Sequence, residues 1–170
     1  SDAFDKVAIG KPLLTTEDDF RAVMKAVTEA TARYDDGETA ICFMGHGTEA
    51  ESNQVYAKLQ DMLTEAGYKN FYVRLAAEFK KQGYGRYHVG TVEATPSLED
   101  MKRETDQTGA RRVVLQPLMI VAGDHANNDM AGDEEGSWKT AFEDAGYEVT
   151  CLVNGLGQLE AIQQLFVEHA

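Results

Sequence analysis

The sequence predicts an α/β fold in which a doubly wound, mainly parallel sheet is flanked by helices. The main observation is that short apolar runs alternate with amphipathic stretches along the 170 residues, the pattern of strands joined by crossover helices. A second is that glycine, proline or a helix-capping residue separates most of these segments. A third is the composition, 43% hydrophobic and 26% charged, which is typical of a globular domain with a core. At this length the chain is expected to form one cored domain rather than two of ordinary size.

The first predicted elements are a short strand at residues 7–9 and a helix that Thr15 or Thr16 caps. Residues 17–19 are acidic and suit the first turn of a helix, where the helix dipole favours negative charge. Apolar side chains at helical spacing continue the helix over residues 20–27.

The later elements alternate in the same way. They are a strand at 39–44, a helix at about 50–66, a strand at about 86–92, a helix from Ser97 to about Thr108, a strand at 113–121, a helix at about 137–145, a strand at 148–153 and a terminal helix from about Gln158. Ser97 and Asp100 form an S-x-x-D capping pair, and Gly109 ends the helix that they begin.

One segment breaks this rhythm, because residues 56–73 are echoed sixteen residues later by residues 72–89. The matched apolar pairs are Leu59 with Leu75 and Leu63 with Phe79. Both copies end in Gly-Tyr and an aromatic-rich strand start. The echo is either a tandem duplication of one helix with its strand entry, or two αβ units made alike by shared patterning. The extra unit, near residues 74–89, either loops out of the fold or shifts the register of a strand.

The charge and hydropathy patterns exclude several classes of partner. A net charge of −13 argues against nucleic acid and against an anionic membrane surface, because both require clustered Lys and Arg. No apolar run approaches the roughly 20 residues of a membrane-spanning helix. We therefore expect neither nucleic acid nor membrane as a partner.

The compartment is predicted from the cysteines and the first residues. Cys42 and Cys151 fall within predicted strands and are interpreted as buried thiols, with no disulfide framework. Residues 1–6 lack the pattern of a signal peptide. A reducing, cytoplasmic location is expected, or a periplasmic one if a signal peptide has been removed.

Two histidines follow buried strands and are the first candidates for chemistry. His46 follows the strand at 39–44 and has a glycine on each side, and His125 follows the strand at 113–121 just after Gly123. Ligands of open parallel sheets bind beyond the carboxyl ends of the strands. The pattern predicts a metal or acid–base site, although a histidine at a strand end can also be a capping or core residue.

Other motifs carry weaker signals. His88 and His169 are interpreted as surface residues. The acidic segment at 124–135 lacks the spacing of a calcium-binding loop, so a structured loop is expected. The Gly-Leu-Gly at 155–157 lacks the third glycine of a dinucleotide fingerprint and is interpreted as a turn.

Three longer motifs carry a family resemblance. They are Phe-Met-Gly-His-Gly-Thr-Glu at 43–49, Val-Gly-Thr-Val-Glu-Ala-Thr-Pro at 89–96 and the segment at 117–133, extended by Trp138-Lys139 and by 155–157. On these motifs, which span the chain from about Ile9 onward, it resembles the sirohydrochlorin cobaltochelatases of anaerobic cobalamin synthesis. These are class II chelatases of the CbiK type. The resemblance implies a chelatase-like or flavodoxin-like three-layer sandwich and a lyase that inserts Co²⁺ into a tetrapyrrole.

The same resemblance implies the site residues. His46 would be the proton acceptor and a metal ligand, and Glu93 and His125 would be the other ligands. An imidazole with a pKa near 6.5 suits proton transfer near neutrality and binding of borderline metals. These ligands bind Ni²⁺ and Fe²⁺ as well as Co²⁺, and no organic cofactor is expected. Read without the resemblance, Glu93 is a helix-dipole acid before Ser97.

The resemblance also bears on domains and partners. The family has two similar halves with the tetrapyrrole between them. Residues 1–36 are interpreted as a remnant of the first half and residues 37–170 as the C-terminal chelatase domain. A homo-oligomer is expected to complete the cleft. Two other hypotheses are a non-catalytic metal or tetrapyrrole carrier and a flavodoxin-like binding module whose histidines are structural.

Overall fold

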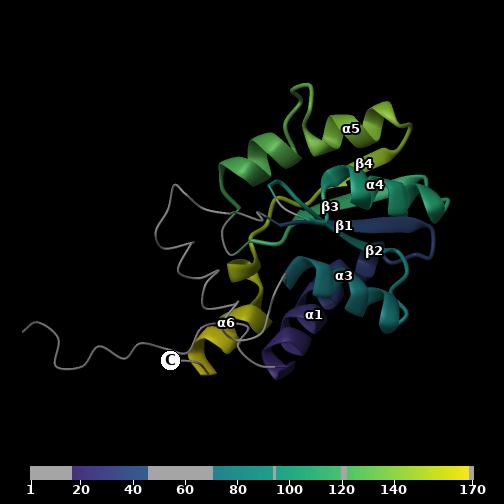
Figure 1. Ribbon diagram of the computed structural model, residues 1–170. Coiled ribbons are helices and arrows are strands. Elements are labelled where there is room, and N and C mark those ends of the chain that lie inside the picture. The colour runs from purple at the N-terminus through teal and green to yellow at the C-terminus, as the bar shows by residue number, and fades with distance from the viewer. Residues whose placement is uncertain (1–16, 46–70, 94, 120–121, 169–170) are drawn as a thin grey trace, which may run out of the picture.

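The computed structural model describes residues 17–45, 71–93, 95–119 and 122–168 (Figure 1). Four strands form one parallel sheet in the order β2-β1-β3-β4. Their bounds are Thr39–Gly45 for β1, Tyr87–Thr91 for β2, Arg112–Pro117 for β3 and Glu148–Cys151 for β4. The predicted α/β fold with a parallel sheet is confirmed.

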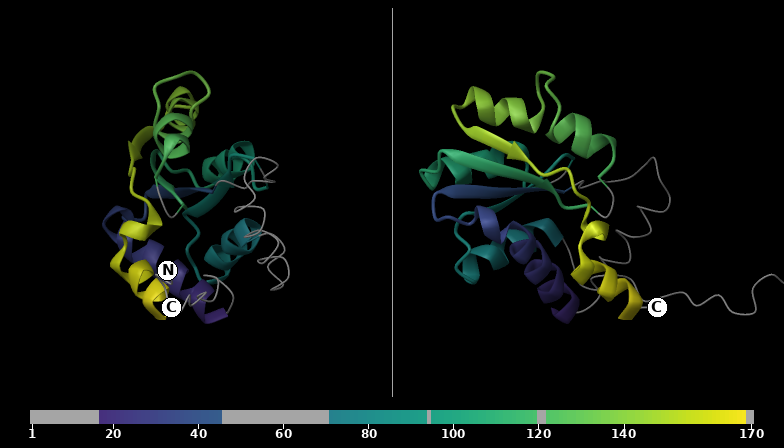
Figure 2. Two further views of the ribbon diagram at one scale, coloured as in Figure 1. Left: turned by 90° about the vertical axis from the view of Figure 1, so that its left-hand side faces the viewer. Right: turned by 180° about the vertical axis from the view of Figure 1, so that it is seen from behind.

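Helices cover both faces of this sheet (Figure 2). The described α-helices are α1 (Glu17–Thr31), α3 (Phe71–Lys81), α4 (Leu98–Gln107), α5 (Trp138–Asp144) and α6 (Glu160–Glu168), and the shorter helices are η1 (Ala32–Tyr34), the π-helix η2 (His125–Met130) and η3 (Leu156–Gln158). The helices α1, α3 and α6 pack on one face, and α4, η2 and α5 pack on the other.

The central strand β1 shows how the sequence builds two cores. Ile41 and Phe43 join the core on the α1 side, whereas Cys42 and Met44 join the core on the α4 side. This alternation is the period of two that a strand imposes on its side chains. Every residue of β1 is buried, as expected for a parallel strand that helices cover on both sides.

The order of the strands makes the sheet doubly wound. From β1 the chain reaches β2 by a connection that includes α3, on one face. From β2 it passes through α4 to β3 and then through η2 and α5 to β4, on the other face and in the opposite direction. The direction of winding therefore reverses between β1 and β3, which is the position where such sheets bind ligands.

The predicted capping pair begins α4. The Ser97 hydroxyl accepts a hydrogen bond from the Asp100 backbone N–H (3.2 Å), and the Asp100 carboxylate accepts one from the Ser97 N–H (3.0 Å). Gly109 follows the helix with a φ of +71°, a conformation that glycine adopts without strain. Both ends of α4 are therefore fixed by local chemistry that the sequence predicts.

Other boundaries differ from the prediction. The strand expected at 113–121 ends at Pro117, and the last backbone bond to β1 comes from the N–H of Leu118. The terminal helix α6 begins at Glu160, after the single turn η3. The strand expected at 7–9 and the helix expected at 50–66 lie outside the described residues.

The second copy of the echoed segment is part of the sheet. Residues 71–81 form α3, whose Leu75 and Phe79 are fully buried. Strand β2 then pairs with β1 from the couple Ile41–Tyr87 to the couple Gly45–Thr91. The unit near 74–89 is thus not looped out of the fold, and most of its counterpart lies outside the described residues.

No helix within the described part of the chain is long and apolar enough to cross a membrane.

Candidate functional site

The predicted site residues follow three neighbouring strands in the sequence. Glu93 follows β2 and His125 follows β3, while β1, which lies between these strands, ends at Gly45, directly before His46. His46 itself lies outside the described residues. Because the strands are parallel, their carboxyl ends meet at one edge of the sheet, and the reversal of winding between β1 and β3 lies at this edge (Figure 1).

Hydrogen bonds join the ends of these strands. The Val92 N–H donates to the Gly45 carbonyl at 3.0 Å, so the residue before Glu93 is bonded to the residue before His46. On the other side of β1, the Leu118 N–H donates to the Met44 carbonyl at 2.7 Å. Backbone hydrogen bonds therefore join the ends of β2 and β3 to the end of β1, directly before the segments that contain the predicted ligands.

The short loop that carries Glu93 is closed on itself. The backbone N–H and the hydroxyl of Thr91 both donate to the Pro96 carbonyl, at 2.7 and 2.8 Å. Glu93 is exposed on this loop, and the acids in the first turn of α4 are Glu99 and Asp100 instead. Glu93 thus lies between the end of β2 and the Ser97 cap of α4, and its role as a ligand or as a helix-dipole acid stays a prediction.

Gly45 is required by packing. A Cβ atom at this position would overlap the aromatic ring of Tyr72, which comes from α3. Any larger residue would have to displace Tyr72 or move the end of β1. The glycine before His46 therefore lets α3 approach the strand closely.

His125 begins the π-helix η2. Ala126 and Met130 anchor this helix in the core, and the backbone and side-chain N–H groups of Asn127 both donate to the Gly123 carbonyl at 3.1 Å. π-Helical turns occur frequently at functional sites. The acidic segment at 124–135, which was expected to be a structured loop, therefore begins with a short helix that packs on the core.

The end of the acidic segment is pinned to α5. A Cβ on Gly132 would overlap the Asn128 carbonyl oxygen, while the Gly132 carbonyl accepts from the Ser137 hydroxyl at 2.6 Å. The Lys139 ammonium lies 2.5 Å from the Asp133 carboxylate and lowers its pKa. This packing and this ion pair belong to the motif on which the resemblance rests.

The Gly-Leu-Gly motif also reaches the same edge. Leu156 begins η3, and its N–H donates to the Met119 carbonyl, just beyond β3, at 2.6 Å. The interpretation of residues 155–157 as a turn is confirmed.

The prediction that His88 lies on the surface is wrong. His88 lies within β2 and is 2% exposed, facing α4, with its Nδ1 3.5 Å from the Glu104 carboxylate. Burial lowers the pKa of His88, and the negative charge of Glu104 opposes that shift. Its position between two apolar residues of a strand does not reveal this burial, because the helix α4 that covers it comes later in the chain. His169, which was also placed on the surface, lies outside the described residues.

The two cysteines are free thiols. Cys42 is fully buried in β1, and burial raises its pKa to about 12. Cys151 is half-buried at the end of β4, and burial raises its pKa as well. Neither thiol is poised as a nucleophile or metal ligand, because both tasks require a thiolate.

Within the ranges that the structure describes, no group of three or more His, Cys, Asp or Glu side chains could hold a metal ion. The predicted set of His46, Glu93 and His125 includes a residue outside those ranges, so its assembly stays a prediction.

Comparison with known proteins gives the family. The family model described as "Cobalt chelatase (CbiK)" matches residues 1–78 and 69–170. The chain belongs to the CbiK family of cobalt chelatases. Its CbiK relatives include a "Sirohydrochlorin cobaltochelatase" of Salmonella typhimurium, 35% identical over 98% of this chain and 56% of the relative. Another is "Sirohydrochlorin cobaltochelatase CbiKC" of Nitratidesulfovibrio vulgaris, 26% identical over 99% of this chain and 54% of the relative. The chain spans about half the length of the curated relatives it matches.

Proposed function

We propose that this CbiK-family chain inserts Co²⁺ into sirohydrochlorin and that His46, Glu93 and His125 perform the reaction. The observation that carries the proposal is that these residues follow three adjacent parallel strands at the point where the winding of the sheet reverses. Both named relatives are sirohydrochlorin cobaltochelatases, which supports this choice of metal and tetrapyrrole.

The chemistry divides among the three residues. Insertion removes two pyrrole N–H protons and strips water from a divalent cation. His46 is the proton acceptor and a ligand, because a neutral imidazole both accepts protons near neutrality and binds borderline metals. Glu93 supplies a charged oxygen ligand and His125 a second nitrogen. Asp124 and Asp129, on the same turn as His125, are proposed to orient its ring.

The proposal also covers the choice of metal, the oligomeric state and the cellular compartment. Nitrogen and oxygen ligands also bind Ni²⁺ and Fe²⁺, so availability contributes to the choice of Co²⁺. A second copy of the chain is proposed to face the site as a homo-oligomer. The two free thiols favour a reducing cytoplasm, and a removed signal peptide would place the reaction in the periplasm instead.

The test is anaerobic absorbance spectroscopy of sirohydrochlorin and Co²⁺ with the full chain. Multiple-turnover conversion above a protein-free blank is expected. The His46→Ala/His125→Ala double variant should reduce the rate to that of the blank, because it removes the proposed acceptor and two ligands. Sedimentation of the same sample measures the oligomeric state.

A matched pair of variants isolates the carboxylate. Glu93→Gln is expected to lower the rate at least about tenfold, whereas Glu99→Gln, which removes another exposed acid from α4, should leave it unchanged. Binding of one equivalent of metal without turnover would favour the carrier hypothesis. Equal rates in the wild type, the double variant and Glu93→Gln would exclude the proposed residues.

A further inference from the structure

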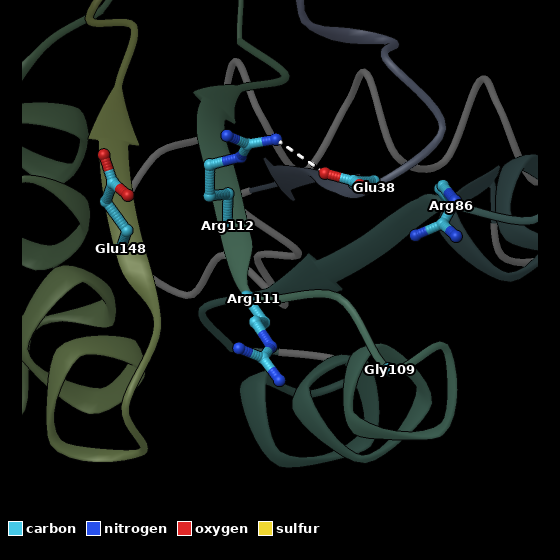
Figure 3. A pocket seen from close by; sticks show the side chains of 6 residues that line it. All are labelled: Glu38, Arg86, Gly109, Arg111, Arg112 and Glu148. Atoms are coloured by element: carbon cyan, nitrogen blue, oxygen red, sulfur yellow. Dashed lines mark hydrogen bonds and ion pairs between the residues drawn. The ribbon is translucent and has the colours of Figure 1, made fainter.

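A second candidate site lies at the opposite edge of the sheet, where the strands begin. A cavity of about 470 Å³ is lined there by Glu38, Arg86, Gly109, Arg111, Arg112 and Glu148 (Figure 3). Each charged residue begins a strand or directly precedes one. Three arginines therefore line one cavity of a chain whose net charge is −13.

The three arginines differ in whether their guanidinium groups form ion pairs within the described residues. Arg112 is paired with Asp36 at 3.0 Å and with Glu38 at 3.1 Å. The guanidinium groups of Arg86 and Arg111 make no ion pair or hydrogen bond with another residue in the described ranges, and the Nη1 atom of Arg86 is enclosed by protein. An enclosed donor without a partner costs free energy unless a ligand or water accepts from it.

Arg86 and Arg111 each directly precede a strand, at an even spacing from side chains of that strand that face α4. Arg86 is two residues from His88, which faces Glu104 of α4, and Arg111 is two residues from Val113, which shares a core cluster with Met101 of α4. Figure 3 shows Arg111 and Arg112 pointing in opposite directions, with only Arg112 directed at Glu38. Arg86 and Arg111 are thus the cations that can bind a ligand on the α4 side of the cavity.

We propose that Arg86 and Arg111 bind a small dianion, either a phosphate group or a pair of carboxylates. Guanidinium groups form bidentate, charge-assisted hydrogen bonds with both kinds of oxyanion. Of the two acids in the lining, Glu38 is neutralised by Arg112, and the Glu148 carboxylate points away from Arg111 (Figure 3). The space beside Gly109 is empty, since a Cβ there would meet no atom within 4 Å.

The experiment is isothermal titration calorimetry of the full chain with inorganic phosphate and, separately, with citrate, at an ionic strength fixed with chloride. One saturable site is expected. The anion that binds more tightly shows whether the site prefers a phosphate group or carboxylates. Arg111→Gln, at an exposed position, should weaken binding at least about tenfold, because a hydrogen bond to a charged group contributes that much. Arg86→Gln should do the same, and Glu148→Gln should tighten binding by removing a like charge.

The matched control is Arg103→Gln, which removes the same charge from a 68% exposed side chain of α4 that pairs with Asp100. This variant should bind the anion as the wild type does. No saturable binding of either anion, or equal weakening in Arg103→Gln and Arg111→Gln, would overturn the proposal. No metal or tetrapyrrole enters the assay, so its result is independent of the chelatase activity.

Discussion

At the scale of single residues, His88 is expected to make stability depend on pH. Its folded pKa lies below the ordinary value of 6.5, because burial favours the neutral ring. Its contribution is therefore complete above about pH 6.5 and is lost as the pH falls through 6.5 toward the folded pKa. Glu104 favours the protonated ring, whereas Lys80 and Arg86 oppose it. The free energy of unfolding should decrease on acidification, by at most about 1.4 kcal/mol per pH unit for this one proton.

Urea unfolding of the wild type and of His88→Gln between pH 7.5 and about 4.5 measures this effect, and the variant should show the flatter profile. Asp36 titrates in a separate window. Hydrogen bonds from the backbone N–H groups of Glu38 and Thr39 lower its pKa from 3.8 to about 2, so its contribution is lost only below 3.8. An NMR titration that gives His88 a pKa above 6.5 would contradict the prediction, whether or not the variant folds.

The same residue shows what sequence patterns do and do not reveal at this scale. A polar side chain between two apolar ones is read as exposed when one face of a strand meets water. In β2 both faces are covered by helices, so Tyr87, His88 and Val89 are all buried. Burial of His88 depends on α4, which follows it in the chain, and no local pattern contains that contact. By contrast, the burial of Cys42 could be predicted, because its neighbours in β1 are also apolar.

At the scale of elements, the closed loop that carries Glu93 depends on Thr91. Replacing Thr91 with Val removes the hydroxyl bond to the Pro96 carbonyl but keeps the side-chain shape and the backbone bond. We expect a loss of about 1 kcal/mol in the free energy of unfolding and weaker binding of Co²⁺, because Glu93 is held less firmly. Thr91→Ser retains the hydroxyl and should restore metal affinity. Chemical denaturation and a Co²⁺ absorbance titration measure the two quantities, and Co²⁺ affinity that is equal in Val and Ser variants would contradict the positioning role.

Element prediction succeeds where the chemistry is local. The Ser97–Asp100 pair predicts the start of α4, because both partners lie within one turn and reach each other's N–H groups. The apolar run predicts an end of β3 that is too late, since the run continues past Pro117 although the strand does not. Hydrophobicity reports burial, and burial continues beyond the last residue that can pair as a strand.

At the scale of the whole molecule, alternation predicts a parallel sheet but not the order of its strands. The position of β1 between β2 and β3 arises from pairings such as Cys42 with His88 and Cys42 with Leu115, which join distant parts of the chain. That order places the ends of β1, β2 and β3 side by side. Sequence and family motifs therefore propose candidate site residues, whereas the adjacency of the strands that these residues follow required the fold.

The echoed segment gives the last prediction. The two matches to the CbiK family model share residues 69–78, which is expected if the family has one helix–strand unit where this chain has two. The described sheet uses the second copy, as α3 and β2. Deleting residues 55–70 removes one period of the echo and no described residue. We expect this deletion to leave the thermal unfolding midpoint and the Co²⁺ affinity unchanged.

Deleting residues 71–86 instead is the matched comparison, because it removes sixteen residues and leaves the first copy to form the helix. In that chain Leu63 would replace Phe79, whose ring is stacked on Phe43 at 5.7 Å and lies 5.3 Å from the ring of Tyr87. Since an aromatic pair contributes about 0.5–1.5 kcal/mol beyond its buried area, this deletion should be less stable by about 1–3 kcal/mol. The thermal unfolding midpoints of both deletions, measured by calorimetry, decide whether the echo is a tandem duplication or two units that share only a pattern. Unfolding of the 55–70 deletion would mean that the two copies are different units, alike only in pattern, and that the sheet needs both.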